Sequence, residues 1–125
     1  MPEAITFENV YPIGDTRTDA LPTKALGPAI GYYTQVLGFS LVEKQENRAT
    51  LRRDAVTIGL EVNADDPEQA SCYFAVSDVE ALRVELEAKG IEPSPLRLDT
   101  HNSKKYRVFF AKEPYGVCFC FGQPA

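Results

Sequence analysis

Apolar residues recur at helical spacing in the stretch between residues 26 and 37. Leucine, isoleucine and tyrosine side chains follow one another there at steps of four, three and four, which predicts an amphipathic helix. Pro28 is tolerated only in a first turn, so the regular helix should begin close to it. Gly38 supplies the conformational freedom that a helix end needs. We therefore predict the first helix over 26–37.

A second helix is predicted farther along the chain, with clearer signals at both ends. Ser77 and Glu80 have the spacing of a capping box, and Gly90 marks the end of the helix. The apolar stripe that this helix should bury consists of Val79, Leu82 and Leu86.

Alternating apolar residues, typical of β-strands, surround both helices. One strand is predicted before each helix, at 5–13 and 71–76. Three strands should follow the first helix and three the second, at 39–43, 49–53, 55–62, 91–96, 106–112 and 117–121. Tight turns are expected at Asp54 and at 113–116, where Pro and Gly occupy the positions that a type I turn prefers.

The order strand–helix–strand–strand–strand thus occurs twice in one chain. Gly38 and Gly90 close the two helices, and the polar stretch 63–69 links the two units. A unit of this size cannot bury both faces of its sheet alone, so the two units should pair. The stretch 16–24 has no clean periodicity, and we interpret it as a surface loop or lid extension. We predict a single α+β domain over 1–125, built from tandem βαβββ modules at about 1–62 and 70–125.

Composition and charge exclude several classes of function. The net charge of −5 and the lack of long basic clusters argue against a nucleic-acid partner. No apolar run reaches the length of a membrane span, and the start of the sequence lacks signal-peptide features. The three cysteines include no Cys-x-x-Cys pair, which favours a reducing compartment over a disulfide framework. We therefore expect a cytoplasmic protein that binds neither membranes nor nucleic acid.

An ordered set of short motifs spans nearly the whole chain. Its members are 10–15, 32–39, 51–56, 76–82 and 113–123, the last with Glu-Pro-Tyr-Gly-Val in its turn. This set resembles the vicinal-oxygen-chelate superfamily of glyoxalases, bleomycin-resistance proteins and dioxygenases, and is most similar to its bleomycin-resistance branch. The resemblance implies paired βαβββ modules whose sheets curl around an open cavity, and a homodimer with crevices between the subunits. Chemistry is not implied, because this scaffold carries both metal enzymes and metal-free binders.

The resemblance also places four metal-ligand positions on the strands. They correspond here to Glu8 (or Asn9), Glu61, Ser71 and Cys120. Only Glu61 is a convincing ligand, since a serine is a poor ligand and a thiolate is soft. We therefore expect no cofactor and no metal; if a metal does bind, Glu8 and Glu61 are its candidate ligands. The only histidine, His101, is assigned to a polar loop at 99–103, away from these strands.

Strand alternation supplies the remaining cavity candidates. Glu61 should face the cavity with Thr57 and Gly59, while Ile58, Leu60 and Val62 pack on the helices. Cys118 and Cys120 share one strand face, either as a thiol pair lining the cavity or as small apolar residues beside a core. Tyr106 and Val108 lie opposite Arg107 and Phe109, and alternation alone does not show which pair points inward. The candidate ligand-binding residues are Glu61, Tyr73, Tyr106, Arg107, Cys118 and Cys120.

These observations favour a metal-free small-molecule-binding protein. The expected ligand is a cationic or aromatic antibiotic, held by sequestration and without bond chemistry, as the resemblance to bleomycin-resistance proteins implies. The alternative is a metal-dependent glyoxalase-like lyase, isomerase or thiol transferase, so whether the protein is an enzyme stays open. A third reading is an unrelated small metabolite as the natural ligand.

Overall fold

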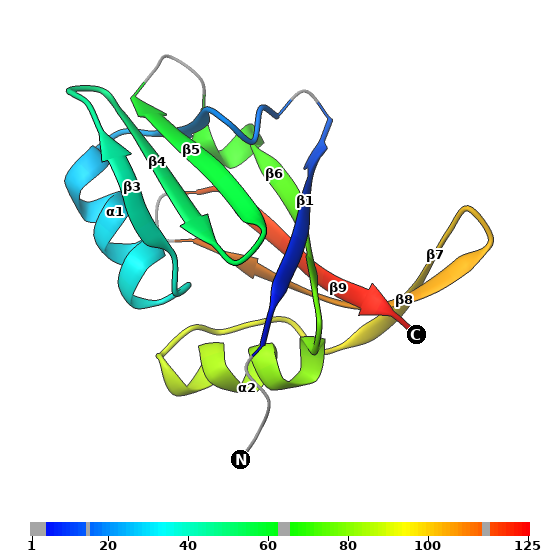
Figure 1. Ribbon diagram of the computed structural model, residues 1–125. Coiled ribbons are helices and arrows are strands. Elements are labelled where there is room, and N and C mark those ends of the chain that lie inside the picture. Colours follow the sequence, from blue (N-terminus) through cyan, green and yellow to red (C-terminus); the bar gives the residue numbers. More distant parts are fainter. Residues whose placement is uncertain (1–4, 15, 63–65, 114–115) are drawn as a thin grey trace.

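Two β-sheets and two helices account for most of the residues that the computed structural model describes, which are 5–14, 16–62, 66–113 and 116–125. The five-stranded sheet has the order β1-β6-β9-β8-β7, and the four-stranded sheet the order β2-β5-β4-β3. Helix α1 packs against the four-stranded sheet and α2 against the five-stranded one (Figure 1). The strands are β1 (Phe7–Ile13), β2 (Leu21–Thr23), β3 (Ser40–Lys44), β4 (Arg48–Arg53), β5 (Val56–Val62), β6 (Ser71–Val76), β7 (Arg97–His101), β8 (Lys104–Lys112) and β9 (Cys118–Pro124).

The predicted duplication is confirmed, but with a different first strand. Each copy contains one parallel pair of strands, β2 with β5 in the first copy and β6 with β9 in the second. The other two strands of each copy add to this pair in antiparallel order, β4 and β3 in the first copy and β8 and β7 in the second. The first copy therefore runs β2-α1-β3-β4-β5, and the second runs β6-α2-β7-β8-β9. Strand β1 is additional: it pairs antiparallel with β6 in the sheet of the second copy. It also contacts β5 of the first copy, and the Ala55 N–H donates to the Phe7 carbonyl at 3.2 Å.

The interpretation of 16–24 as a surface loop is wrong for its second half. Leu21, Pro22 and Thr23 form the buried strand β2, which pairs in parallel with Leu60–Val62. Alternation could not reveal it, because the strand is only three residues long and all three are buried. Its proline also argues against a strand in a sequence reading. The rest of the segment carries the chain from β1 to β2.

Strand β7 begins later in the chain than the sequence predicts. The predicted strand 91–96 is not a strand, because Pro93 and Pro95 have no N–H to donate to a ladder. The strand is Arg97–His101 instead, and it pairs with β8 through a turn at Asn102 and Ser103, both of which have positive φ. Figure 1 shows this β7–β8 hairpin extending from the body of the molecule.

Helices α1 (Leu26–Gln35) and α2 (Val79–Ala88) lie close to the predicted positions. Gly38 and Gly90 have positive φ just past the two helix ends, as expected. The capping box is wrong: the carboxylate of Asp78 caps α2 by accepting from the Ala81 N–H at 3.0 Å. Ser77 instead accepts from the Thr6 N–H at 2.8 Å. None of the described helices is long and apolar enough to span a membrane.

The core is a cluster of aromatic rings between the two sheets and their helices. Phe74 contacts Phe119 and Phe121 at centroid distances of 5.2 and 5.4 Å, and Tyr33 of α1 reaches Phe119 at 5.8 Å. Because strand side chains alternate, these rings occupy the helix side of the five-stranded sheet and leave its other face open. Val79, Leu82 and Leu86 of α2 are fully buried, as predicted.

Three smaller expectations have mixed outcomes. Asp54 makes the predicted tight turn, with φ of +53°. In the 113–116 turn the Gly116 N–H donates to the Glu113 carbonyl, while 114 and 115 lie outside the described residues. In the linker 63–69, residues 63–65 also lie outside them, and Pro67–Gln69 forms a short 3-10 helix.

Candidate functional site

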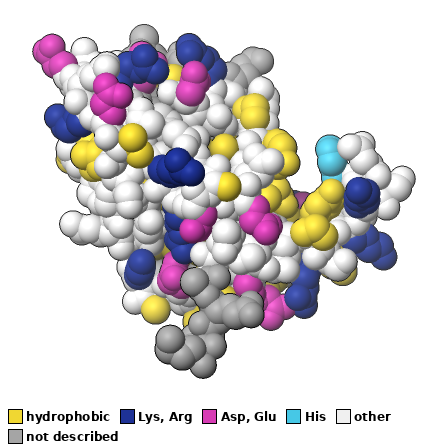
Figure 2. Space-filling view, viewed as in Figure 1, with side chains coloured by type: hydrophobic (Ala, Val, Ile, Leu, Met, Phe, Trp, Pro, Cys, Tyr) yellow, Lys and Arg dark blue, Asp and Glu magenta, His cyan; other side chains and the backbone are white. Residues whose placement is uncertain are grey.

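A hollow of about 580 Å³ lies on the open face of the five-stranded sheet. It is bounded on one side by β1 and on the other by the β7–β8 hairpin, and Figure 2 shows apolar side chains gathered between the body and this hairpin. The lining residues are Tyr11, Pro12, Ile13, Tyr73, Asp99, Thr100, His101, Tyr106, Val108 and Cys120.

Strand register brings the floor of the hollow together from distant parts of the chain. Tyr11 of β1 pairs with Tyr73 of β6, which pairs with Cys120 of β9. Residues that are directly opposite in register point to the same face, so these three side chains form one row across the sheet. The rings of Tyr11 and Tyr73 are tilted against each other, with centroids 6.1 Å apart. The floor is therefore aromatic at one end and sulfur-bearing at the other.

The Tyr73 side chain lies against Gly122 of the neighbouring strand. A Cβ atom added at Gly122 would lie 2.8 Å from Cε2 and 2.9 Å from Cζ of Tyr73, closer than real Cβ contacts allow. The glycine thus leaves the space into which the phenol end of the ring settles. Any other residue at this position would lift the ring away from the sheet.

The β7–β8 hairpin forms the opposite wall and contributes the polar groups of the hollow. The Arg97 guanidinium makes two contacts of 3.1 Å to the Asp99 carboxylate, through Nε and Nη2. The same guanidinium lies 4.7 Å from the centroid of the Phe110 ring. His101 lies at the end of β7 and lines the hollow. Its assignment to a loop away from the site is wrong, because the polar residues of 97–101 hide a strand.

Burial makes two groups of the floor, Tyr73 and Cys120, harder to ionise. It raises the pKa of Tyr73 to about 12, with the nearby Cys120, Tyr106 and Tyr11 adding to the effect. Burial also raises the pKa of the Cys120 thiol to about 12, and the Asp99 charge contributes. Cys120 is therefore a thiol and a poor nucleophile, since the thiolate is the reactive form. Tyr73 keeps its hydroxyl proton and can donate a hydrogen bond.

Three of the six predicted ligand-binding residues meet in the hollow. Tyr73, Tyr106 and Cys120 line it, and Val108 beside Tyr106 shows that this face of β8 points toward the hollow. Phe109 is fully buried on the other face, in the core.

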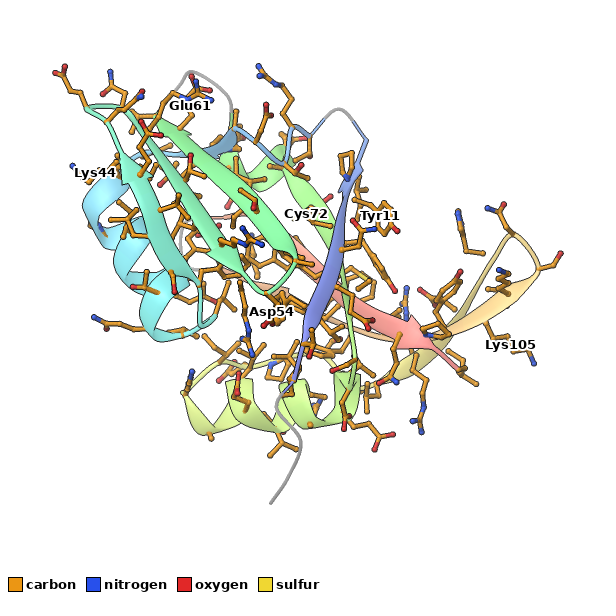
Figure 3. All side chains as sticks on the ribbon, in the orientation of Figure 1. Tyr11, Lys44, Asp54, Glu61, Cys72 and Lys105 are labelled. Atoms are coloured by element: carbon orange, nitrogen blue, oxygen red, sulfur yellow. The ribbon has the colours of Figure 1, made fainter. Side chains whose placement is uncertain are left out.

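The other three predicted residues lie elsewhere. Cys118 is half-buried on the same strand as Cys120 but does not line the hollow. Arg107 lies on the helix side of β8, where it forms an ion pair of 2.6 Å with Glu80 of α2. Glu61 belongs to β5 of the four-stranded sheet, with Arg48 Nε 4.0 Å from its carboxylate. Figure 3 shows Glu61 and Tyr11 on separate sheets, away from each other.

The chain itself covers part of the face that Glu61 was expected to share with a cavity. The Gly59 N–H donates to the Thr18 carbonyl at 2.9 Å, and the Asp19 backbone occupies the place that a side chain at 59 would need. Ile58 and Leu60 are buried as predicted, whereas Val62 is 36% exposed because it lies at the end of the strand. This face is therefore not an open counterpart of the hollow.

The four metal positions implied by the resemblance do not form a suitable donor set. Glu61 lies outside the hollow, and Glu8 is exposed at an irregularity in the β1–β6 register. Ser71 offers a neutral hydroxyl, and burial raises the pKa of the Cys120 thiol, which disfavours the thiolate that would bind a metal. Within the described ranges, no three His, Cys, Asp or Glu side chains come together as a metal site would require.

Sequence reasoning missed two parts of the lining. Tyr11, Pro12 and Ile13 were assigned to a strand but not to the site, because alternation does not show which strand pairs with β1. Asp99, Thr100 and His101 were assigned to a loop. A sequence feature could have revealed the second of these parts. The Asn102-Ser103 pair has the length of a two-residue hairpin turn, and the strands on its two sides are Arg97–His101 and Lys104–Lys112.

The chain resembles known proteins in both sequence and structure. The model of the Glyoxalase/Bleomycin resistance protein/Dioxygenase superfamily matches residues 19–121. No curated protein matches the chain. Among solved structures, virulence protein STM3117 from Salmonella typhimurium shares 24% identity and a TM-score of 0.71, covering 90% of this chain and 100% of that one.

Two further structures with this fold are named for bleomycin. The bleomycin-binding protein from bleomycin-producing Streptomyces verticillus, complexed with copper(II)-bleomycin, has 18% identity and a TM-score of 0.69, covering 85% of this chain and 93% of that one. The bleomycin resistance determinant encoded on the transposon Tn5 has 17% identity and a TM-score of 0.71, covering 88% and 98%. At these identities the likeness shows the fold alone.

Fold and sequence define an α+β protein of paired βαβββ modules with one open, tyrosine-lined sheet face. Since the family model matches most of its length, the chain belongs to the Glyoxalase/Bleomycin resistance protein/Dioxygenase superfamily.

Proposed function

We propose that this protein binds a flat aromatic small molecule in the hollow and sequesters it without bond chemistry. The observation that carries the proposal is the convergence of Tyr11, Tyr73 and Tyr106 from three strands on one open concave face. Aromatic rings favour offset or edge-on contacts with other rings, each contributing about 0.5–1.5 kcal/mol beyond simple burial. Three such rings around one space suit an aromatic ligand better than an aliphatic one.

The size of the hollow agrees with a ligand of this class. Ligand sites usually have volumes of about 300–1,000 Å³ and combine an apolar lining with a few polar groups. The hollow has about 580 Å³, with Ile13 and Val108 as aliphatic walls and His101 and Asp99 as polar groups. A bicyclic or tricyclic ring system with one polar substituent fits these proportions.

An antibiotic of the bleomycin class is the first ligand to test. Its support is the fold shared with the bleomycin-binding protein of Streptomyces verticillus and the Tn5 resistance determinant. The lining favours the aromatic part of the expected antibiotic. Glu61, the acidic residue among the candidate ligand-binding residues, does not line the hollow and so gives a cationic part no partner there. An unrelated aromatic metabolite would satisfy the same lining.

A homodimer is part of this proposal. The hollow is open on the side away from the core, and a second copy placed over it would enclose the ligand. Exposed Tyr11 and Ile13, at 51% and 43%, are the apolar residues that such an enclosure would cover. Light scattering coupled to gel filtration measures the mass directly, and a mass near 14 kDa, that of one 13.8 kDa chain, would contradict the dimer. The three free thiols support the cytoplasmic location that we expected.

Calorimetric titration with a bleomycin-class glycopeptide and with naphthalene-2-carboxamide, an uncharged bicyclic probe, tests the binding function. We expect saturable binding that weakens about 3–10-fold in Tyr11→Ala, because one ring contact is lost. Val84→Ala is the matched control, since it removes an exposed apolar side chain from α2 instead. No heat with either compound at high micromolar concentration would refute the proposal.

Elemental analysis separates this function from the metal-dependent alternative. The donor set described above gives that alternative no specific support. Protein purified without chelators should carry no stoichiometric divalent metal. A stoichiometric metal that is lost on Glu61→Ala would instead contradict the metal-free binding function.

A further inference from the structure

We propose that the ligand of the hollow is a planar aromatic acid, with its anionic group held at the β7–β8 hairpin. This inference rests on the proposed binding function and adds the charge of the ligand to it. It keeps the aromatic part of the expected cationic or aromatic antibiotic and reverses the charge.

Among the described residues that line the hollow, the one acidic side chain, Asp99, is already paired with an arginine. Asp99 receives two contacts of 3.1 Å from Arg97, the bidentate arrangement in which arginine holds a carboxylate most firmly. Arg97 is itself fixed by its position over the Phe110 ring. A cationic ligand would therefore share Asp99 with Arg97, which already contacts both carboxylate oxygens in a solvent-exposed pair. An anionic ligand meets no such competition.

The hairpin is a basic element in an otherwise acidic chain. Between 97 and 107 it carries four basic side chains and a single acidic one, Asp99, while the whole chain has a net charge of −5. The remaining lining residues, from β1, β6, β8 and β9, are uncharged. Arg97 is paired with Asp99 and Arg107 with Glu80 of α2, so the unpaired hairpin charge among the contacts described above is that of the two lysines. The four basic residues are Arg97, Lys104, Lys105 and Arg107.

Lys104 and Lys105 are adjacent in sequence but lie on opposite faces of the hairpin. Lys104 lies on the same face of β8 as Tyr106 and Val108, which line the hollow. It pairs in register with His101 of β7. Lys105 lies on the other face of β8, with Arg107, and its side chain points away from the hollow (Figure 3). Lys104 is thus the cation whose strand face continues the hairpin wall. Its neighbour provides an internal reference of the same charge.

The hydrogen-bond donors of the hollow also suit an acid. The Tyr73 hydroxyl stays protonated at neutral pH and donates to an acceptor, and the His101 imidazole offers an N–H. Carboxylates accept hydrogen bonds from neutral donors as well as from cations. A ring acid lying on Tyr73, with its carboxylate toward β7, satisfies both the apolar floor and the polar wall.

Three probes with the same ring system test the charge of the ligand. Naphthalene-2-carboxylate, naphthalene-2-carboxamide and naphthalene-2-carboxamidine are anionic, neutral and cationic at neutral pH, and their dissociation constants are measured by calorimetry at low salt. We expect the carboxylate to bind at least about threefold more tightly than the amide, and the amidine most weakly. This preference should shrink as salt is added, because the hairpin charges are exposed.

Matched variants then locate the interaction. Lys104→Gln should weaken carboxylate binding about 2–5-fold and leave amide binding unchanged, while Lys105→Gln should leave both within about twofold. Equal binding of the three probes, tighter binding of the amidine, or equal effects of the two lysine variants would overturn the inference while leaving the binding function intact. If none of the probes binds, the proposed function fails and this inference fails with it.

Discussion

The phenol end of the Tyr73 ring occupies space that exists only because residue 122 is a glycine. The two residues lie on neighbouring parallel strands, β6 and β9, of the five-stranded sheet. This contact sets the level of the aromatic floor, because the ring settles onto the backbone of β9 instead of standing up from the sheet. The depth of the hollow thus depends on a residue that does not itself line it.

Substitution Gly122→Ala should close the hollow from below. The added methyl group meets Cε2 and Cζ of Tyr73 at less than 3 Å, so the ring must rotate toward the space that a ligand would fill. We expect binding of naphthalene-2-carboxylate to weaken about tenfold or more, with a loss of stability of about 1 kcal/mol. Calorimetry and urea unfolding measure the two effects. Undiminished binding would show that Tyr73 does not form the floor.

Much of the fold followed from the sequence, because most elements have clear periodic signals. The apolar stripe of α2 and the alternation of β6 determine both position and buried face. Strand β2 has neither signal, and its existence depends on pairing with β5. Strand β7 was hidden by polar residues whose alternation matters only once β8 lies beside them.

The site was only partly predictable, because some of its residues come together only through the pairing of distant strands. Alternation made Tyr73 and Cys120 candidate cavity residues, but it left open whether Cys120 lines the cavity or packs beside the core. Tyr11 joins them only because β1 crosses to the sheet of the second copy. Glu61 was assigned to the same cavity because sequence does not reveal that the open faces of the two sheets are separate.

Substitution Gly59→Ala should destabilise the fold strongly. The methyl group would collide with the backbone of Asp19, which cannot move aside as a side chain can. We expect a loss of about 2–3 kcal/mol in the free energy of unfolding. The control is Gly31→Ala, in the interior of α1, where nothing lies within 4 Å of the added atom. Since alanine favours helices, this control should be neutral or stabilising by up to about 1 kcal/mol. Equal effects would contradict the packing of 18–19 on β5.

Arg53 should contribute more to stability than the other ion-paired arginines of the surface. Its Nη1 donates to the Leu37 carbonyl at 2.7 Å, and its guanidinium lies 4.3 Å from the centroid of the Phe7 ring. It is also the ionic partner of Glu85, whose buried Oε2 has no hydrogen-bond partner among the described residues. Arg53→Met should cost about 2–4 kcal/mol in urea unfolding, and Arg53→Lys should restore little of it.

The half-exposed Arg107–Glu80 ion pair is the reference against which the stability contribution of Arg53 is compared. Although its distance is only 2.6 Å, solvent screens the charges, so Arg107→Met should cost less than about 1 kcal/mol. A loss as large as that of Arg53→Met would show that distance, and not burial, decides the contribution of an ion pair in this protein.

Stability should fall as the pH rises above the pKa of an unfolded cysteine, about 8.5. Burial raises the pKa of Cys120 to about 12, so between these values the unfolded chain loses a proton that the folded chain keeps. The folded state then binds more protons, and the free energy of unfolding decreases by up to about 1.4 kcal/mol per pH unit for this thiol. Urea unfolding between pH 8 and pH 10 measures the slope.

Replacing the thiol tests this assignment. Cys120→Ala should reduce the slope by about half, because burial also raises the pKa of the Cys72 thiol, which still contributes. Val117→Ala, which removes buried volume nearby without a titratable group, should lower stability equally at each pH. An unchanged slope in Cys120→Ala would mean that this thiol ionises in the folded protein as readily as in the unfolded chain.

Tyrosine ring resonances in the NMR spectrum offer the most direct test of the binding site. The chain has six tyrosines and no tryptophan. Three tyrosines line the hollow, while Tyr32 and Tyr33 lie in α1 on the far side of the core. During titration of ring-labelled protein with naphthalene-2-carboxylate, the resonances of Tyr11, Tyr73 and Tyr106 should shift together and saturate, and those of Tyr32 and Tyr33 should stay in place. Saturable binding that shifts the α1 tyrosines and leaves Tyr11, Tyr73 and Tyr106 unmoved would contradict the hollow as the ligand site.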